Sequence, residues 1–210
     1  MIELTKIAEA LQVGNDKVVY EKTREAIKQG VPAKTILDDG LIAGMNVISE
    51  KFRKHEIFLP HVLLAAKAMY AGMDLLKPLF IKEKIPSRGK IVIGTVQGDL
   101  HDIGKNLVGI MLKGAGFEVI DLGKNVSVEN FVETAISENA HVIGMSALLT
   151  TTQPVMKKVV DELKKRKLDK NIKTIIGGAP LSAEYAELIG ADAYSYDAAN
   201  AVVSVSELVK

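Results

Sequence analysis

The sequence contains no cysteine and no tryptophan, and its formal net charge at pH 7 is only +1. The absence of cysteine excludes disulfides, thiolate nucleophiles and thiolate metal ligands, and it is typical of proteins from a reducing compartment. The balanced charge provides no global field that would attract nucleic acid or an anionic membrane surface. We therefore expect no nucleic-acid partner.

Long apolar runs are also missing. No run approaches the roughly 20 residues that span a bilayer, and the first stretch, MIELTKIAEALQ, lacks the apolar core of a signal peptide. These absences predict a cytoplasmic protein with no membrane partner. Apolar residues are nevertheless plentiful, at 48% of 210 residues, which is enough for one large core or two modest ones.

The first part of the chain has the apolar spacing of helices and no strand signal. Helices are expected over residues 4–14, closing on Gly14, over 15–30, beginning at a capping Asn15, and from Pro32 to residue 52. A fourth helix is expected from about residue 59, with apolar residues at i, i+3, i+4 and i+7. Its apolar stripe comprises Leu59, Val62, Leu63, Ala66, Met69, Met73 and Leu76. Short connections between these segments predict an all-α four-helix bundle domain over residues 1–88.

The pattern changes after the charged stretch KEKIPSRGK, residues 82–90. Short apolar runs then alternate with amphipathic segments. Strands are expected at 90–96, 117–123, 141–147, 173–179 and 191–196, and helices near 103–114, 128–138, 153–167, 183–188 and 198–209. Such strand–helix units predict an α/β C-terminal domain over residues 89–210, with a Rossmann- or flavodoxin-like five-stranded parallel sheet.

Residues that could bind a ligand or take part in a reaction follow three of the expected strands. They are Asp99 and His101 after the first strand, Ser146 with the threonines 150–152 at the end of the third, and Gly177-Gly178 at the end of the fourth. In the flavodoxin-like order, ligands bind outside the carboxyl ends of the strands, at the switch point between the first and third. We expect the three segments to form one ligand site there.

These residues alone leave the ligand open. A lone histidine in such a loop also occurs as a helix cap or as a water-facing side chain. The stretch GDLHDIGKN imitates a phosphate-binding Walker loop, but five residues rather than four separate Gly98 from Gly104, and Asn106 replaces the usual Ser or Thr. Asp99 and Asp102 would repel a phosphate.

A direct metal site and a phospho-acceptor site are further alternatives. Asp99, His101 and Asp102 are suitable ligand types, yet no second cluster at ligand spacing occurs elsewhere. A receiver domain needs an aspartate at the end of the third strand, where this chain has Ser146. A carboxylate beside a histidine can, however, fix the imidazole tautomer and make the other ring nitrogen a better metal ligand. That metal can arrive inside a cofactor, and the nearby glycines permit close approach of a bulky group.

Asp99-x-His101-x-x-Gly104, followed by Ser146-x-Leu148 and Gly177-Gly178, resembles the three-part signature of cobalamin-binding domains. The resemblance implies a cobalamin or related corrinoid, bound base-off and His-on, with His101 as the lower axial ligand of cobalt and Asp99 as its hydrogen-bond partner. It also implies that Ser146 and the glycine pair line a channel for the nucleotide tail. Thr152 stands where the family often completes the relay with a hydroxyl. The cofactor-binding residues expected on this basis are Asp99, His101, Asp102, Ile103, Gly104, Ser146, Leu148, Thr150, Thr152, Gly177 and Gly178.

The stretch GMNVISEKFRKHEIFLPHVLLAAKAM, residues 44–69, is similar to the helical cap of methionine synthase and of the small corrinoid proteins of methanogens and acetogens. In that family, apolar cap residues cover the upper face of the corrin. The matching positions are Phe52, Leu59 and Val62, for which bundle core is the alternative interpretation. Residues 53–58, RKHEIF, are more charged than expected of methionine synthase, so the surface presented to partners differs.

The resemblance implies a freestanding corrinoid protein, since mutase subunits need no such cap and cobalamin-sensing regulators need a DNA-binding module. It would carry a methyl group on cobalt between a substrate:corrinoid methyltransferase and a methylcorrinoid:tetrahydrofolate or coenzyme M methyltransferase, with a reductive activase as a further partner. Such a carrier is not a complete catalyst by itself. The cap would swing away for each partner about a hinge at residues 82–89. A cobalamin storage or sensor protein without methyl transfer is the alternative.

Overall fold

The computed structural model describes residues 4–83 and 87–210. The chain divides into a helical unit and an α/β unit, with the boundary between Ser87 and Arg88. The hinge expected at residues 82–89 includes residues 84–86, which lie outside the described residues. Each unit is described separately below.

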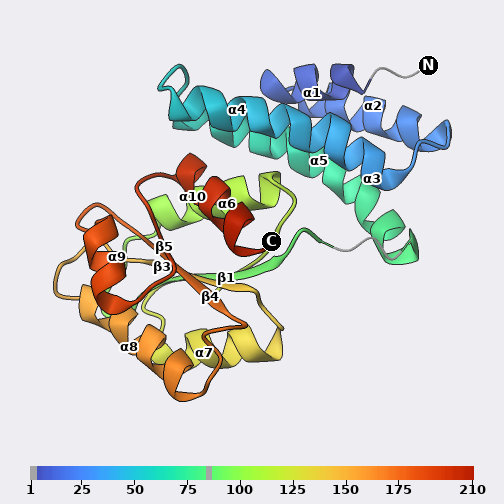
Figure 1. The fold of residues 1–210 in the computed structure, drawn as a ribbon. Coiled ribbons are helices and arrows are strands. Elements are labelled where there is room, and N and C mark those ends of the chain that lie inside the picture. The colour runs from blue at the N-terminus through green and yellow to red at the C-terminus, as the bar shows by residue number, and fades with distance from the viewer. Residues whose placement is uncertain (1–3, 84–86) are drawn as a thin grey trace. The chain divides into compact units, whose positions relative to one another are not determined.

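The helical unit consists of helices joined by short connections (Figure 1). Its segments are α1 (Thr5–Gln12), α2 (Asp16–Lys28), α3 (Ala33–Thr35), the π-helix η1 (Ile36–Ile42), α4 (Ala43–Arg53) and α5 (Leu59–Glu83). Asn15 caps α2 as expected, because its side chain accepts a hydrogen bond from the backbone N–H of Val18 at 3.1 Å. The helix expected from Pro32 is helical as far as Arg53, but the sequence did not reveal its π-helical middle.

Small residues allow the helices of this unit to pack closely. A Cβ added to Gly44 of α4 would lie 2.9 Å from the carbonyl oxygen of Ala8 in α1. The expected stripe on α5 is mostly buried, but Leu63 is 45% exposed, so its place in that stripe was wrong. Leu63 lies about 100° around the helix from the fully buried Val62, and alanines at 65 and 68 complete the buried face on the other side.

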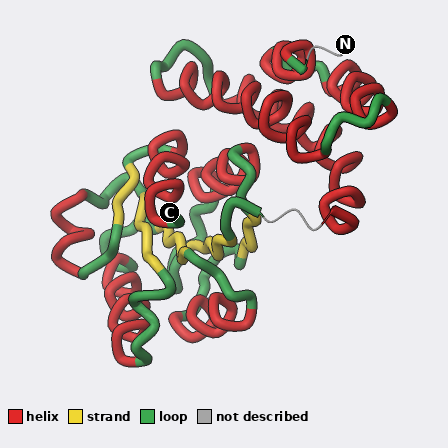
Figure 2. The backbone as a smooth tube through the Cα atoms, turned by 45° about the vertical axis from the view of Figure 1, so that its right-hand side comes forward, coloured by secondary structure: helices red, strands yellow, loops and turns green. Residues whose placement is uncertain are grey.

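The α/β unit contains the five-stranded parallel sheet that the sequence predicts. Its strands are β1 (Lys90–Thr95), β2 (Glu118–Asp121), β3 (Val142–Ser146), β4 (Lys173–Gly177) and β5 (Ala193–Ser195). The order is β2-β1-β3-β4-β5, which confirms the flavodoxin-like arrangement. The connecting helices are α6 (Ile103–Gly114), α7 (Val128–Ser137), α8 (Gln153–Lys165), α9 (Ala183–Ile189) and α10 (Ala198–Leu208), and they flank the sheet on both faces (Figure 2).

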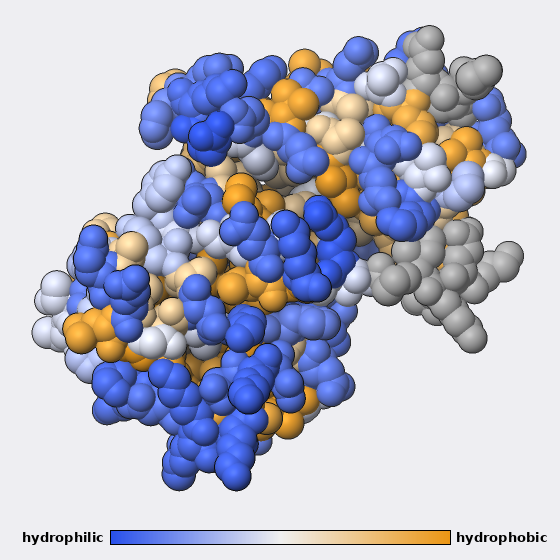
Figure 3. All heavy atoms as spheres, in the orientation of Figure 1, coloured by the Kyte–Doolittle hydropathy of each residue, from blue (hydrophilic) through white to orange (hydrophobic). Residues whose placement is uncertain are grey.

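Successive side chains of each strand point to opposite faces of the sheet, so the sheet has an apolar core on each face. Val92, Ile143 and Ile176 pack with Phe131 of α7 and with residues of α8 and α9 in one core cluster. The opposite face is covered by α6 and α10 (Figure 1). The outward sides of α7 and α8 carry mainly polar and charged side chains (Figure 3). The expected element ends differ by a few residues: α8, for example, ends before Lys167, whose φ of +60° is left-handed.

Candidate functional site

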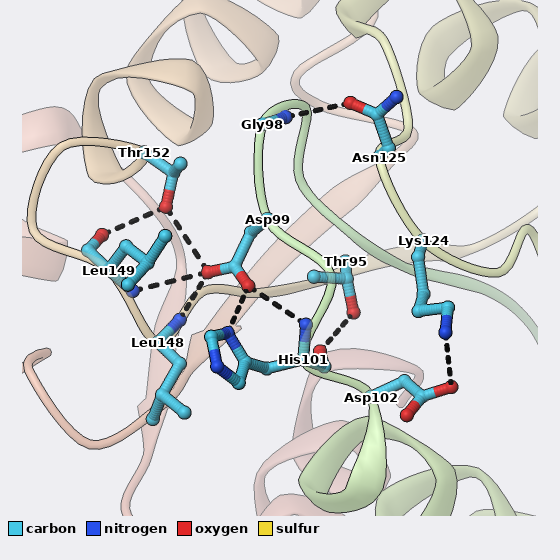
Figure 4. Close-up of polar contacts among 10 residues, drawn as sticks. All are labelled: Thr95, Gly98, Asp99, His101, Asp102, Lys124, Asn125, Leu148, Leu149 and Thr152. Carbon is cyan, nitrogen blue, oxygen red and sulfur yellow. Dashed lines mark hydrogen bonds and ion pairs between the residues drawn. The ribbon is translucent and has the colours of Figure 1, made fainter.

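A single buried carboxylate joins the loops that follow β1 and β3 (Figure 4). Asp99 has no exposed surface. Its Oδ1 accepts hydrogen bonds from the backbone N–H of His101 at 3.0 Å and from the ring Nδ1 of His101 at 2.7 Å. Its Oδ2 accepts from the backbone N–H groups of Leu148 at 2.7 Å and Leu149 at 3.1 Å. The carboxylate therefore sits at the switch point between β1 and β3, where the fold argument placed a ligand site.

The surroundings keep Asp99 ionised. Burial by itself raises the pKa of this carboxyl group, but the N–H donors of His101, Leu148 and Leu149 outweigh burial and hold the pKa well below its usual range. An ionised carboxylate can only accept hydrogen bonds, so Nδ1 of His101 must carry the proton of the neutral ring. The lone pair of the imidazole then resides on Nε2.

His101 presents that second nitrogen away from Asp99 (Figure 4). Its side chain is 53% exposed, and the ring nitrogen that does not face Asp99 points away from it (Figure 4). The backbone of His101 is also held, because the hydroxyl of the buried Thr95 donates to its carbonyl oxygen at 2.8 Å. The result is an imidazole with a fixed tautomer, a fixed main chain and an accessible electron pair.

Exposed apolar side chains occur close to His101 and Asp99 in the loops after β1 and β3 and at the start of α6. Leu100 is 65% exposed, Ile103 is 74% exposed, and Leu148 and Leu149 are 43% and 40% exposed. Such a concentration of apolar surface is typical of a binding site. Gly104, in the first turn of α6, has no atom within 4 Å of the position that a Cβ would take and no left-handed φ. The chain itself does not require glycine there, so the space is available to a bulky ligand.

Small residues in and just after β3 and β4 provide a second feature that fits such a ligand. Gly144, Ser146 and Gly177 remain partly exposed although both strands lie inside the sheet. Gly178 is required by the backbone, because its φ is +143° and a Cβ would lie 1.9 Å from the carbonyl oxygen of Ala147. The exposed apolar side chains and the small residues therefore fit a large ligand with apolar surface.

The two threonines predicted for the site differ in their contacts. The Oγ1 of Thr152 lies 3.3 Å from Oδ2 of Asp99 and donates to the carbonyl oxygen of Leu149 at 2.8 Å. A hydroxyl has one proton, and the shorter contact goes to Leu149. Thr150 is exposed and makes none of these contacts. Asp102 lies at the rim, 3.7 Å from the ammonium group of Lys124.

Sequence reasoning missed Asn125, which lies in the loop after β2 and holds the loop that contains Asp99. Its Oδ1 accepts from the N–H of Gly98 at 2.8 Å, and its backbone N–H donates to the carbonyl oxygen of Asp99 at 3.1 Å. Its φ of +55° is a conformation that asparagine tolerates better than most residues. The available signal was an asparagine in the loop after the second strand. The apolar Leu100 and Leu149 were missed as well.

The expected cap residues lie in the helical unit. Phe52 and Leu59 are half-buried at either end of the α4–α5 connection, whereas Val62 is fully buried. A side chain without exposed surface cannot contact a ligand without rearrangement, so Val62 acts as bundle core in this structure. Phe58, between them, is 68% exposed and was not predicted. Among the described residues, no three His, Asp or Glu side chains gather to bind a metal ion, and no helix is long and apolar enough to cross a membrane.

Known proteins identify the class of this fold and site. The sequence pattern of one B12 binding domain matches residues 89–205, and that of another B12 binding domain matches residues 3–77. The chain belongs to the B12-binding family. The cofactor class expected from the sequence, a cobalamin or related corrinoid, is thereby confirmed.

Within this family, the chain is similar to small corrinoid proteins, as the sequence indicated. It is 47% identical to dimethylamine corrinoid protein 1 of Methanosarcina acetivorans, over 88% of this chain and 87% of that protein. It is 40% identical to trimethylamine corrinoid protein 1 of Methanosarcina mazei, over 96% and 94%. The methanol:cobalamin methyltransferase complex of Methanosarcina barkeri contains a chain that is 30% identical, with a TM-score of 0.86, covering 98% of this chain and 79% of that one.

Proposed function

We propose that this protein is the corrinoid subunit of a methylamine-dependent methyltransferase system. The observation that carries the proposal is the half-exposed imidazole of His101, whose Nδ1–H is held by the buried Asp99 and whose Nε2 is free to bind cobalt. The higher identity to methylamine corrinoid proteins than to the methanol system supports a methylamine:corrinoid methyltransferase as the donor-side partner. A methylcorrinoid:coenzyme M or tetrahydrofolate methyltransferase would accept the methyl group, and a reductive activase would restore the active oxidation state.

When bound, the corrinoid supplies a cobalt atom that accepts a methyl group from one protein and gives it to another. His101 would bind the cobalt through Nε2, and Asp99 would hold the ring in the required orientation. Leu148 and Leu149 would contribute their backbone N–H groups, which hold the carboxylate in place from the loop after β3.

The pair can also hold a proton. A ring whose Nε2 is not bound could hold a proton there, and the resulting imidazolium would still donate Nδ1–H to the ionised carboxylate of Asp99. Because Asp99 is buried and already carries backbone donors, the negative charge stays in place for either state of the ring. Asp99 would thus stabilise the protonated ring without itself taking the proton.

In the α/β unit, the residues that would border the corrin are Asp102, Ile103, Gly104, Leu148 and Thr150. In the helical unit, Phe52 and Leu59 would shield it from water. Ser146, Gly177 and Gly178 would line the path of the nucleotide tail. We place Thr152 as a support of the Leu149 carbonyl oxygen, because that contact is the shorter of its two.

Electron paramagnetic resonance of the Co(II) form tests the lower ligand. One bound ¹⁴N nucleus splits each cobalt line into three, and protein labelled with ¹⁵N-histidine should give two lines instead. The two-line pattern of the labelled protein should disappear in His101→Ala. It should persist in His141→Ala, because His141 precedes β3 and so lies at the amino ends of the strands, opposite the site. Three lines from the labelled wild type would refute the assignment. Methyl transfer from a methylamine with the cognate methyltransferase would separate a carrier from a storage or sensor protein, which would bind cobalamin without turnover.

A further inference from the structure

One buried hydroxyl of the α/β unit has no hydrogen-bond partner. Ser195 is the last residue of β5 and is only 6% exposed, and its Oγ forms no hydrogen bond with any described residue. A hydroxyl buried in this way costs folding free energy, so native proteins keep few of them. Within the described part of the chain, only Thr23 of the helical unit shares this condition. The position of Ser195 suggests what its hydroxyl is for.

Ser195 is the end of a row that crosses the sheet. Thr95, Ser146, Gly177 and Ser195 are successive register partners on β1, β3, β4 and β5. Register partners point their side chains to the same face of a sheet, and neighbours along a strand point to opposite faces. Tyr194 packs against the core cluster under α7, α8 and α9. The row therefore faces α6 and α10.

This row leads away from the imidazole site. At one end, Thr95 donates its hydroxyl proton to the carbonyl oxygen of His101. In the middle, Ser146 and Gly177 are partly exposed between the sheet and its helices. At the far end, α10 packs on β4 and β5 with buried alanines at 198, 199 and 201, which occupy little volume. A ligand anchored at His101 that extends a narrow chain along this face would pass Ser146 and Gly177 and reach Ser195.

We propose that the Oγ of Ser195 donates a hydrogen bond to an acceptor atom of the corrinoid's nucleotide tail. The inference rests on the proposed function, because it requires a corrinoid anchored at His101. A nucleotide offers ring nitrogens and ribose or phosphate oxygens as acceptors, and binding would supply the partner that the hydroxyl lacks. Ser195 contributes to binding of the nucleotide tail and does not contribute to binding of the corrin ring. It therefore increases the preference for complete corrinoids over corrinoids that lack the nucleotide.

The test compares hydroxocobalamin with aquocobinamide, which has the corrin ring but no nucleotide. Their affinities are measured for the full-length wild type, Ser195→Ala and Thr23→Val, which removes the other unpartnered hydroxyl. Ser195→Ala should bind cobalamin about three- to tenfold more weakly, the value of one neutral hydrogen bond, and cobinamide with unchanged affinity. Thr23→Val should leave both affinities unchanged. The cofactor-free Ser195→Ala protein should unfold at the same temperature as the wild type or higher, because an unsatisfied buried group has been removed.

Two results would overturn the inference while leaving the proposed function intact. One is an unchanged cobalamin affinity in Ser195→Ala, and the other is an equal loss of affinity for both corrinoids, which indicates a structural role. A wild type that binds neither corrinoid would instead refute the proposed function, and this inference with it. If Ser195→Ala does not fold, Ser195→Cys keeps a side chain of similar shape with a much weaker donor, and the same comparison decides.

Discussion

Replacing Asp99 by asparagine should both destabilise the protein and weaken corrinoid binding at His101. The wild-type carboxylate accepts from four N–H donors, two on each oxygen. An asparagine carboxamide has the same shape but one oxygen and one NH₂ group, so one pair of donors must face another donor. If the NH₂ group faces Leu148 and Leu149, two backbone N–H groups lose their acceptor. If it faces His101, the ring can change tautomer and accept at Nδ1, and only the backbone N–H of His101 stays opposed.

The second orientation costs less and is the one we expect. Hydrogen bonds to a charged group contribute about 1.5–3 kcal/mol each, so losing one and weakening the others should lower the free energy of unfolding by roughly 2–4 kcal/mol. The change of tautomer places the proton on Nε2, where it blocks metal binding. Corrinoid affinity should therefore fall by roughly 10- to 100-fold, the usual effect of removing a partner that orients a metal-binding histidine.

The contribution of Asp99 to the free energy of unfolding should also depend on pH. The pKa of Asp99 in the folded protein lies below its value in the unfolded chain, which is about 3.9 for a free aspartate. Its contribution to stability is thus complete above that unfolded value and is lost as the pH falls toward the folded value. Urea titrations should show a smaller difference between wild type and Asp99→Asn near pH 3.5 than at pH 5.

Asp161→Asn is the matched control, because Asp161 pairs with Lys157 on the exposed side of α8. It should cost no more than about 1 kcal/mol and leave corrinoid binding unchanged. An Asp99→Asn protein as stable as Asp161→Asn, or one whose deficit grows between pH 5 and pH 3.5, would refute the account of the buried carboxylate.

Substitutions at two glycines and one asparagine test the remaining geometry. Gly178→Ala should lower the free energy of unfolding by more than about 2 kcal/mol in urea, because the new Cβ would lie 1.9 Å from the carbonyl oxygen of Ala147; an unchanged midpoint would contradict this. Gly104→Ala should leave the cofactor-free protein equally stable or up to about 1 kcal/mol more stable, and should weaken cobalamin binding roughly tenfold by filling needed space. Equal cobalamin affinity would show that this space is unused. Asn125→Gly keeps the left-handed backbone but removes the acceptor for Gly98, and should cost about 1 kcal/mol, with Asn125→Ala costing about 1 kcal/mol more; the opposite order would argue against this role of Asn125.

The fold was largely predictable because its signals are local and repeated. Each strand is a short apolar run followed by a helical period, and five such units restrict the topology to a doubly wound sheet. The cap at Asn15 also depends only on neighbouring residues. The errors arose where neighbours in space decide the outcome. Leu63 has the spacing of a core residue, but the position of the other helices leaves it exposed.

The same division applies to the site. Asp99 and His101 are two residues apart, so their pairing was visible in the sequence. The backbone donors of Leu148 and Leu149 lie about fifty positions away in the chain. Because every residue except proline has a backbone N–H, residue type does not indicate which of these groups will bind Asp99. Asn125 is similarly joined to Gly98 only by the folding of the sheet.

By itself, the sequence determined the α/β class, the preceding helices and the aspartate–histidine pair, because periodicity and short spacings are properties of the chain alone. Only the tertiary structure decided that Asp99 is buried and held ionised by a distant loop, that Val62 belongs to the bundle core, and that Ser195 lies in a row with Ser146 across the sheet. The physical reason is that burial, desolvation and strand register depend on which distant segments pack together, and no local pattern specifies those partners.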